Sequence, residues 1–202
     1  ISRYNRRLGK FGDSIETMAS GTEDRREIRF QVMAEIGIET GDRVLDLGSG
    51  FGDFTRYLDQ KGINTDYCGY DINPDLVEIA RSRYPNCKFE VKDVLNEEYP
   101  LFDYIVSTSS FNLPYHHQDN YDFVKDLLES CYRHVRKGVS IDFLSSYVDF
   151  TSEEGFHYEP ERIFKIAKSI TKRVKIRHDY PLFEFAIYLF KDFDGWSGNK
   201  EI

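Results

Sequence analysis

Apolar residues along this chain gather in short runs, and the segments between the runs carry apolar positions at helical spacing. Alternation of this kind predicts a parallel sheet wrapped by helices. The predicted strands are residues 43–47, 65–71, 87–93, 102–107, 139–144, 173–180 and 183–190. We therefore expect an α/β fold, with a doubly wound, mostly parallel seven-stranded sheet, an antiparallel last strand and helices on both faces.

Five segments between these runs are predicted as helices: residues 23–36, 52–62, 74–84, 119–135 and 160–170. The third has the clearest start, because Asn73 can cap it and Pro74 fits its first turn. The fourth is expected to stop at Arg136, Lys137 and Gly138, since basic residues and glycine are typical of helix ends.

A chain of 202 residues with 40% hydrophobic content suits one domain with a sizeable core. The sequence contains no repeat and no Pro- or Ser-rich linker that would divide it. We expect a single domain over residues 1–202, in which residues 23–202 form the Rossmann-like core. Residues 1–22 are expected to form a lid or N-terminal helical arm, which can close over a bound ligand.

The formal net charge of −8 disfavours a nucleic-acid partner, because phosphate backbones reward clustered Lys and Arg. No apolar stretch approaches the length of a membrane span, and no secretory signal is visible. Three cysteines without CxxC spacing favour reduced thiols. These features predict a cytoplasmic protein that acts on a small molecule and leave its oligomeric state open.

Three glycines at alternate positions, Gly48, Gly50 and Gly52, follow the first predicted strand. Glycine permits positive φ and lets the backbone approach a ligand closely. Asp71 ends the second strand, where a carboxylate can accept hydrogen bonds from both ribose hydroxyls. Pyrophosphate binding uses G-x-G-x-x-G, whereas here Asp53 stands in place of the third glycine and would repel a pyrophosphate. The loop therefore favours a nucleoside with a charged tail over a dinucleotide.

Four segments in this order, VLDLGSGFG, YDINP, VKDV and FDYIVSTSSF, resemble the motifs of class I S-adenosylmethionine-dependent methyltransferases over residues 40–145. The resemblance implies S-adenosylmethionine as the cofactor and methyl transfer as the reaction. No metal is expected, because adjacent loop histidines such as His116 and His117 rarely bind one ion without further ligands. It also implies a set of cofactor-binding residues: Asp46, Gly48, Gly50, Asp71, Ile72, Asp93, Val94 and Ser107.

Each of these residues takes a role from its place in the motifs. Asp46, with the backbone around the first two glycines, is expected to hold the methionine part of the cofactor. Asp71 is expected to bind the ribose and Ile72 to pack on the adenine. Asp93 and Val94 are expected at the adenine edge, although Asp93 can also simply cap the turn that follows it.

Ser107, just after the fourth strand, is expected near the sulfonium. Likeness of fold identifies the methyl donor and does not identify the acceptor. His116 and His117, after the fourth strand, and His157, after the fifth, are candidate bases, since an imidazole can accept a hydroxyl proton at neutral pH. The alternative is that the loop histidines are exposed and only cap the following helix.

The segments SSYVDF and RHDYPLFEF resemble a group of bacterial methyltransferases associated with glycan and secondary-metabolite clusters. This resemblance implies a small polar acceptor, methylated on an oxygen of a sugar or secondary metabolite. Phe111, Tyr115 and Tyr147 are expected either as an aromatic wall for that acceptor or as core. Three alternatives stay open: an amino-nitrogen methyltransferase, a catalytically silent binder of S-adenosylmethionine or S-adenosylhomocysteine acting as a partner subunit, and an NAD(P)-linked oxidoreductase.

Overall fold

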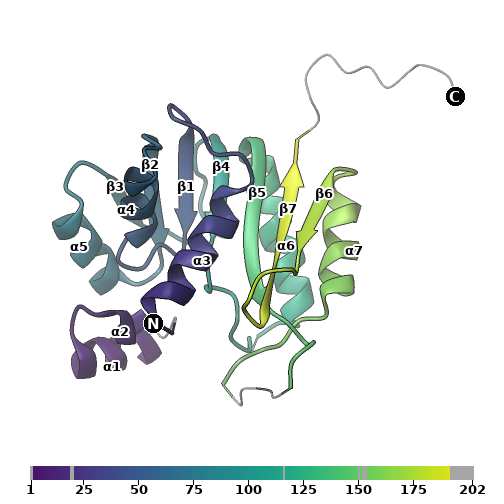
Figure 1. Cartoon of the computed structure of the whole chain (residues 1–202), viewed down its shortest axis with the longest axis horizontal. Helices are drawn as coiled ribbons and strands as arrows, with labels where there is room; N and C mark the ends of the chain where they lie inside the picture. Colours follow the sequence, from purple (N-terminus) through teal and green to yellow (C-terminus); the bar gives the residue numbers. More distant parts are fainter. Residues whose placement is uncertain (1, 19–20, 116, 150, 152–153, 192–202) are drawn as a thin grey trace, which may run out of the picture.

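The structure is a computed structural model that describes residues 2–18, 21–115, 117–149, 151 and 154–191. Its strands form one seven-stranded sheet in the order β3-β2-β1-β4-β5-β7-β6 (Figure 1). The strands are β1 (Arg43–Leu47), β2 (Asp66–Asp71), β3 (Lys88–Val91), β4 (Phe102–Ser107), β5 (Val135–Leu144), β6 (Val174–Arg177) and β7 (Glu184–Phe190).

The first five strands pair in parallel, whereas β7 pairs antiparallel with both β5 and β6. The predicted fold class, with an antiparallel last strand, is confirmed. The last strand of the chain does not lie at the sheet edge, because β7 inserts between β5 and β6. The order of the other strands places the ends of β1 and β4 at the point where the chain direction along the sheet reverses, which is where such sheets bind ligands.

Helices cover both faces of the sheet, as expected for a doubly wound fold (Figure 1). One buried cluster joins α3, α4 and α5 to one face, and a second joins α6 and α7 to the other. Within the described part of the chain, every helix is too short or too polar to cross a membrane. The helices are α1 (Ser2–Phe11), α2 (Ile15–Met18), α3 (Glu23–Ala34), α4 (Asp53–Gln60), α5 (Pro74–Arg83), α6 (Asn120–Arg133) and α7 (Pro160–Ile170).

The helix starts follow the local signals in the sequence. The side chain of Asn73 accepts a hydrogen bond from the backbone N–H of Asp75 at 3.0 Å and so caps α5, whose first turn contains Pro74. The side chain of Asp119 accepts from the N–H groups of Tyr121 and Asp122 at the start of α6.

The expected end of the 119–135 helix was wrong. The helix α6 ends at Arg133, and Val135 begins β5 opposite Phe102 of β4. Val135 is buried, and the N–H of Phe102 donates to the carbonyl of His134 at 2.9 Å. Backbone pairing with β4 therefore overrides the helical spacing, and Arg136 and Lys137 lie in the strand.

The carboxyl ends of the parallel strands meet at the lower edge of the sheet in Figure 1, and α1 and α2 lie beside that edge. The short N-terminal helices are thus placed next to the glycine loop that follows β1. This edge carries the candidate site.

Candidate functional site

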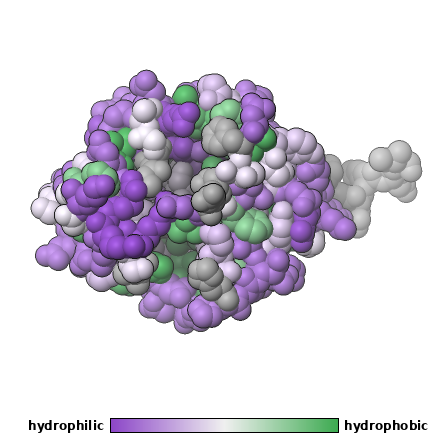
Figure 2. Space-filling view, turned by 90° about the horizontal axis from the view of Figure 1, so that it is seen from below, coloured by the Kyte–Doolittle hydropathy of each residue, from purple (hydrophilic) through white to green (hydrophobic). Residues whose placement is uncertain are grey.

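A cavity of about 880 Å³ opens at the carboxyl edge of the sheet. Its walls come from the ends of β1 and β2, the segments after β3 and β4, one side of α6, and α1 and α3. Figure 2 views the molecule from this edge and shows a hollow with apolar residues inside it and hydrophilic residues around it. A space of this size suits a nucleoside-sized ligand together with a second small molecule.

The glycine loop is shaped by two segments that pack directly on it. Gly48 and Gly50 have φ values of 73° and 53°, a region that favours glycine. A Cβ on Gly48 would overlap the hydroxyl of Ser110, and a Cβ on Gly50 would overlap the terminal methyl of Met18. Gly48 therefore lets the loop after β4 pack against the glycine loop, while at Gly50 the positive φ favours glycine and the flexible end of Met18 fills the space beside it.

Asp46, at the end of β1, is 3% exposed and accepts a hydrogen bond from the Tyr67 hydroxyl at 2.6 Å. Burial raises the pKa of Asp46 to about 7, the Tyr67 hydrogen bond lowers it, and the charges of Asp71 and Asp53 raise it further. Asp46 lines the cavity. A bound cation beside it would favour the ionised carboxylate.

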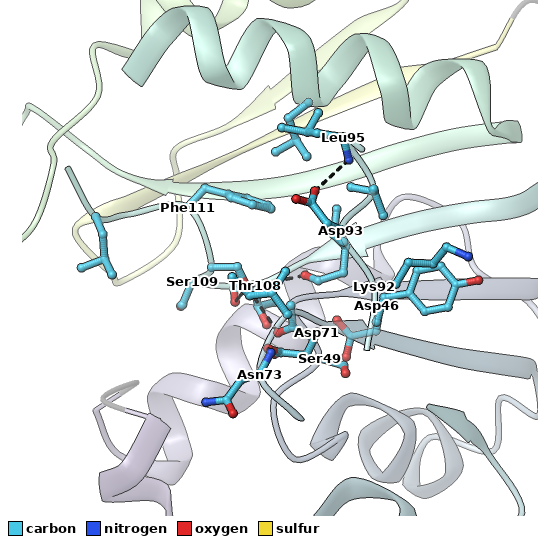
Figure 3. Close-up of a pocket in the computed structure, with 18 of the residues that line it drawn as sticks. Asp46, Ser49, Asp71, Asn73, Lys92, Asp93, Leu95, Thr108, Ser109 and Phe111 are labelled. Carbon is cyan, nitrogen blue, oxygen red and sulfur yellow. Dashed lines mark hydrogen bonds between the residues drawn. The ribbon is translucent and has the colours of Figure 1, made fainter. Parts of the chain in front are cut away.

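Asp71, at the end of β2, accepts hydrogen bonds from the N–H of Gly50 at 3.0 Å and the N–H of Asn73 at 2.9 Å. Burial raises its pKa, while these backbone donors lower it. In the described residues, neither Asp71 nor Asp46 forms an ion pair with Lys or Arg. Figure 3 shows both acids on neighbouring strand ends at the pocket.

Three further predicted residues lie around the same cavity. Ile72 lines it and is 55% exposed, and Val94 lines it from a buried position. Asp93 also lines it, but its carboxylate accepts from the N–H of Leu95 at 3.0 Å and the amide of Asn96 at 2.7 Å (Figure 3). Asp93 thus caps its own turn, which is the alternative raised by the sequence.

Ser107 is fully buried at the end of β4, and its hydroxyl donates to the carbonyl of Leu47 at 2.6 Å. It ties β4 to β1 and does not belong to the residues that line the cavity. The following residues, Thr108 to Phe111, line it instead. Ser107 is the last residue of β4, and its side chain is turned to the Leu47 carbonyl, so the cavity wall begins one residue later, at Thr108.

The candidate bases are not gathered at the cavity. His117 is exposed and does not line it. His157 does not line it either, and its Nδ1 lies 2.7 Å from the carbonyl oxygen of Ser145, beside the bridge that extends β5 to Tyr158. His116 lies outside the described residues. The structure therefore brings neither His117 nor His157 to the place where an acceptor would bind.

Two of the three predicted wall aromatics face the cavity. Phe111 and Tyr115 line it, and the Tyr115 ring stacks on Phe123 of α6 with centroids 3.8 Å apart. Tyr147 is 63% exposed and lies away from the cavity, with its ring centroid 6.0 Å from that of His178. The aromatic wall therefore comes from the loop after β4 and from α6.

Sequence reasoning missed five lining residues from the N-terminal part of the chain. They are Tyr4, Met18, Arg26, Arg29 and Phe30. Arg29 donates to both carboxylate oxygens of Glu184, at 2.7 and 2.6 Å, and both side chains are buried. The two arginines are spaced i and i+3 on α3, which places them on one face, but only docking of α3 shows that this face meets the cavity.

The N-terminal segment, residues 2–18, is held to the core by polar contacts. The Nδ2 of Asn73 donates to the side-chain oxygen of Asn5 at 2.7 Å. Arg83 of α5 donates to Asp13 at 3.1 Å through Nε and to Asp53 at 3.2 Å through Nη1. This ion-pair chain links the segment after α1 to the first residue of α4, next to the glycine loop.

The chain matches the family model of a methyltransferase domain over residues 44–138. A putative methyltransferase of Mycobacterium tuberculosis, Rv1506c, is 31% identical over 157 residues, which are 72% of this chain and 91% of the relative. Trans-aconitate 2-methyltransferase of Escherichia coli is 31% identical over 97 residues. Those residues are 47% of this chain and only 38% of that enzyme.

Solved structures share the fold. Magnesium protoporphyrin IX methyltransferase from Synechocystis, with bound S-adenosylhomocysteine, has a TM-score of 0.67 and 13% identity, covering 95% of this chain and 94% of that one. An S-adenosylmethionine-dependent methyltransferase from Clostridium acetobutylicum has a TM-score of 0.63 and 15% identity, covering 92% and 97%. At these identities the likeness concerns the fold.

Proposed function

The chain belongs to the class I S-adenosylmethionine-dependent methyltransferase family, and from that premise we propose that it methylates an oxygen of a small polar acceptor such as a sugar or secondary metabolite. The protein is an enzyme, and S-adenosylmethionine is its cofactor. Family membership opposes an NAD(P)-linked oxidoreductase and favours an active methyltransferase over a catalytically silent binder.

One observation carries the cofactor site in this proposal. Buried Asp46 and half-buried Asp71 line one cavity on adjacent strands, and neither forms an ion pair with Lys or Arg among the described residues. Acids placed in this way are stabilised by a cationic ligand and would repel a pyrophosphate. The residues present therefore fit a cofactor that carries a sulfonium and an ammonium group.

When bound, S-adenosylmethionine supplies an electrophilic methyl group on its sulfonium centre. In this proposal Asp46 and the backbone at Gly48 and Gly50 hold the methionine end of the cofactor. Asp71 accepts hydrogen bonds from the ribose hydroxyls. Ile72 and Val94 flank the adenine, with Asp93 at its edge. Because these positions are fixed by strand ends, the chain orients the cofactor before an acceptor arrives.

Residues 1–22 act as the lid in this proposal. Tyr4 of α1 and Met18 of α2 line the cavity, and Met18 packs on Gly50. A segment in this position excludes water from the cofactor and completes the acceptor side of the pocket.

The acceptor end combines apolar faces with hydroxyls. Phe111 and Tyr115 offer ring faces, while Thr108, Ser109 and Ser110 offer hydroxyl and backbone groups. A cleft of this kind favours a ring-shaped acceptor that carries hydroxyls, which supports a sugar or a secondary metabolite.

Two kinds of acceptor oxygen differ in whether a proton must be removed before methylation. A hydroxyl needs a base; of the three candidates His116, His117 and His157, neither His117 nor His157 lies in the cavity lining, and His116 lies outside the described residues. A carboxylate needs none, and among the described residues no histidine lines the cavity. Trans-aconitate 2-methyltransferase is named for a carboxylate, which adds support for carboxylate methylation as the second candidate function.

We place the enzyme in a reducing compartment, the cytoplasm. Cys68, Cys87 and Cys131 are all free thiols, and two of them are buried. Burial raises the pKa of Cys68 to about 11, so that this thiol is inert at neutral pH.

Transfer of labelled methyl from S-adenosylmethionine into a fractionated extract tests this function. We expect label in the small-molecule fraction with the wild type and with Asp66→Ala, an exposed acid at the other end of β2, and none with Asp71→Ala. Label released by mild alkali identifies a carboxylate methyl ester, whereas stable label identifies an ether or an amine. Label in protein or nucleic acid would contradict the small acceptor.

A further inference from the structure

Ser109 has an unusual backbone conformation directly at the cavity. It lies two residues after the end of β4, lines the cavity, and has a φ of 55°. It is the only residue other than glycine with positive φ in the described ranges. Such a conformation persists only where the surroundings hold it. Something must therefore fix the backbone at this point of the loop.

The holding group is the carboxylate of Asp142 on the neighbouring strand β5. Its Oδ1 accepts a hydrogen bond from the N–H of Ser109 at 2.6 Å. Asp142 is 1% exposed and does not line the cavity. A short hydrogen bond from an amide to a buried carboxylate is among the stronger ones in a protein. The conformation of the loop thus depends on a side chain behind the pocket wall.

The next residue transmits this constraint to the glycine loop. The hydroxyl of Ser110 lies 3.0 Å from the carbonyl oxygen of Thr108 and 3.3 Å from that of Gly48. Ser110 also occupies the space that a Cβ on Gly48 would fill. The loop after β4 and the glycine loop after β1 are therefore interlocked, and Asp142 fixes both through Ser109.

Three titratable side chains from other elements interact with Asp142. They are Arg29 of α3, Glu184 of β7, and the neutral Tyr180 in the turn between β6 and β7. Arg29 donates hydrogen bonds to both carboxylate oxygens of Glu184, so its single positive charge is shared between Glu184 and Asp142. Neither Oδ2 of Asp142 nor the hydroxyl of Tyr180, both buried, has a hydrogen-bond partner in the described structure.

These surroundings bring the ionisation of Asp142 into the neutral range. Burial raises its pKa most, and the charge of Glu184 raises it further. Arg29 and the N–H of Ser109 act in the opposite direction. Loss of the negative charge weakens the hydrogen bond from Ser109, because a neutral carboxyl is a poorer acceptor.

We propose that Asp142 is a positioning residue for methyl transfer: its carboxylate holds Ser109, and through Ser110 the glycine loop, in the arrangement needed for turnover, and its protonation loosens that arrangement. The inference rests on the proposed function and deepens it, since it names what shapes the acceptor side. Asp142 acts through the loop and touches neither cofactor nor acceptor.

Two variants separate the hydrogen bond from the charge. Asp142→Ala removes the acceptor for the Ser109 N–H, and we expect kcat to fall by about tenfold or more, with less effect on the apparent affinity for S-adenosylmethionine. Asp142→Asn keeps an oxygen acceptor, so we expect kcat to recover at its optimum. In the wild type, kcat should fall as pH drops through neutrality, whereas in Asp142→Asn this dependence on pH should be absent.

Asp103→Asn is the matched control. Asp103 also accepts a backbone N–H across strands, from Arg43 at 2.8 Å, but at the start of β4, the opposite end of the sheet. We expect wild-type kcat and pH profile from this variant. Equal rates for the wild type and Asp142→Ala, or an unchanged pH profile in Asp142→Asn, would overturn the positioning role.

A second measurement needs no acceptor. In ¹⁵N spectra, the amide proton of Ser109 should titrate near neutral pH in the wild type and not in Asp142→Asn. An amide that does not titrate overturns the inference even where Asp142→Ala fails to fold. A wild type that transfers no methyl contradicts the proposed function, while a titrating Ser109 amide would still support the role of Asp142.

Discussion

Asp46 and Asp71 end adjacent parallel strands, with Asp46 paired opposite Gly69, so that Asp71 extends two residues beyond it along β2. The charge of Asp71 is one cause that raises the pKa of Asp46. A bound cation at this edge would offset the repulsion between these carboxylates. Binding of the cofactor and ionisation of Asp46 are therefore linked.

Cofactor affinity should depend on pH. The pKa of Asp46 in the free protein is about 7, and a cation favours its ionised form, so affinity for S-adenosylmethionine should fall as pH drops below 7. The fall should reach at most about tenfold per pH unit, with proton release on binding. Calorimetry at several pH values, in two buffers of different ionisation enthalpy, measures the affinity and the number of protons released. Asp46→Asn should bind weakly at every pH, and pH-independent wild-type binding would contradict this role.

Gly48→Ala should lower cofactor affinity because its Cβ overlaps the Ser110 hydroxyl and its φ is positive. We expect a loss of about 1–3 kcal/mol in the free energy of unfolding. Gly62→Ala is the control, since Gly62 has the same φ of 73° with open space around it. It should lower stability alone. If both variants bind the cofactor like the wild type, the close approach at Gly48 has no functional role.

Arg83→Gln should loosen the N-terminal segment, because Arg83 joins Asp13 to Asp53. Faster cofactor release and faster proteolytic cleavage within residues 2–18 are the expected results. The free energy of unfolding should change by less than about 1 kcal/mol, since the pairs are partly exposed. Stopped-flow displacement and limited proteolysis measure these effects. Arg43→Gln, which breaks a surface pair with Asp66, should leave both rates unchanged.

The stability of the cofactor-free protein should carry the signature of Asp142. The pKa of Asp142 is about 7 in the folded state and about 4 in the unfolded state, so the folded protein holds this proton more tightly. The stabilisation that this proton provides is complete below about pH 4 and is lost as pH rises towards about 7. The free energy of unfolding of Asp142→Asn relative to the wild type should therefore increase over this window. The slope should be at most about 1.4 kcal/mol per pH unit. Denaturant unfolding at several pH values measures it, and a parallel pair of curves would exclude the shift.

Local signals predicted much of the fold. The bounds of β1, β4 and α7 agree with the expected ranges, because each is set by an apolar run or by a proline at its start. The end of α6 was wrong because Val135 has helical spacing in the sequence but pairs with Phe102, a contact that only the assembled sheet provides.

The candidate site divides in the same way. Asp46 and Asp71 could be placed from sequence, because the ends of parallel strands meet at one edge whatever the surrounding side chains are. His117 and His157 could not, since the orientation of a loop depends on its tertiary contacts. Asp142 is an acid inside the apolar run VSIDFL, which marks it in the sequence, but its partner Ser109 lies in the loop after β4 and is brought to it only by the assembled sheet.

Calorimetric titration of S-adenosylmethionine into the wild type, Asp71→Ala and Asp66→Ala tests the central claim most directly. Loss of an acceptor for the ribose hydroxyls should weaken binding to Asp71→Ala by at least about tenfold, the size expected for a hydrogen bond to a charged group. Asp66→Ala, altered at the exposed start of the same strand, should bind like the wild type. Equal affinity in all three proteins would contradict the assignment of this strand edge as the cofactor site.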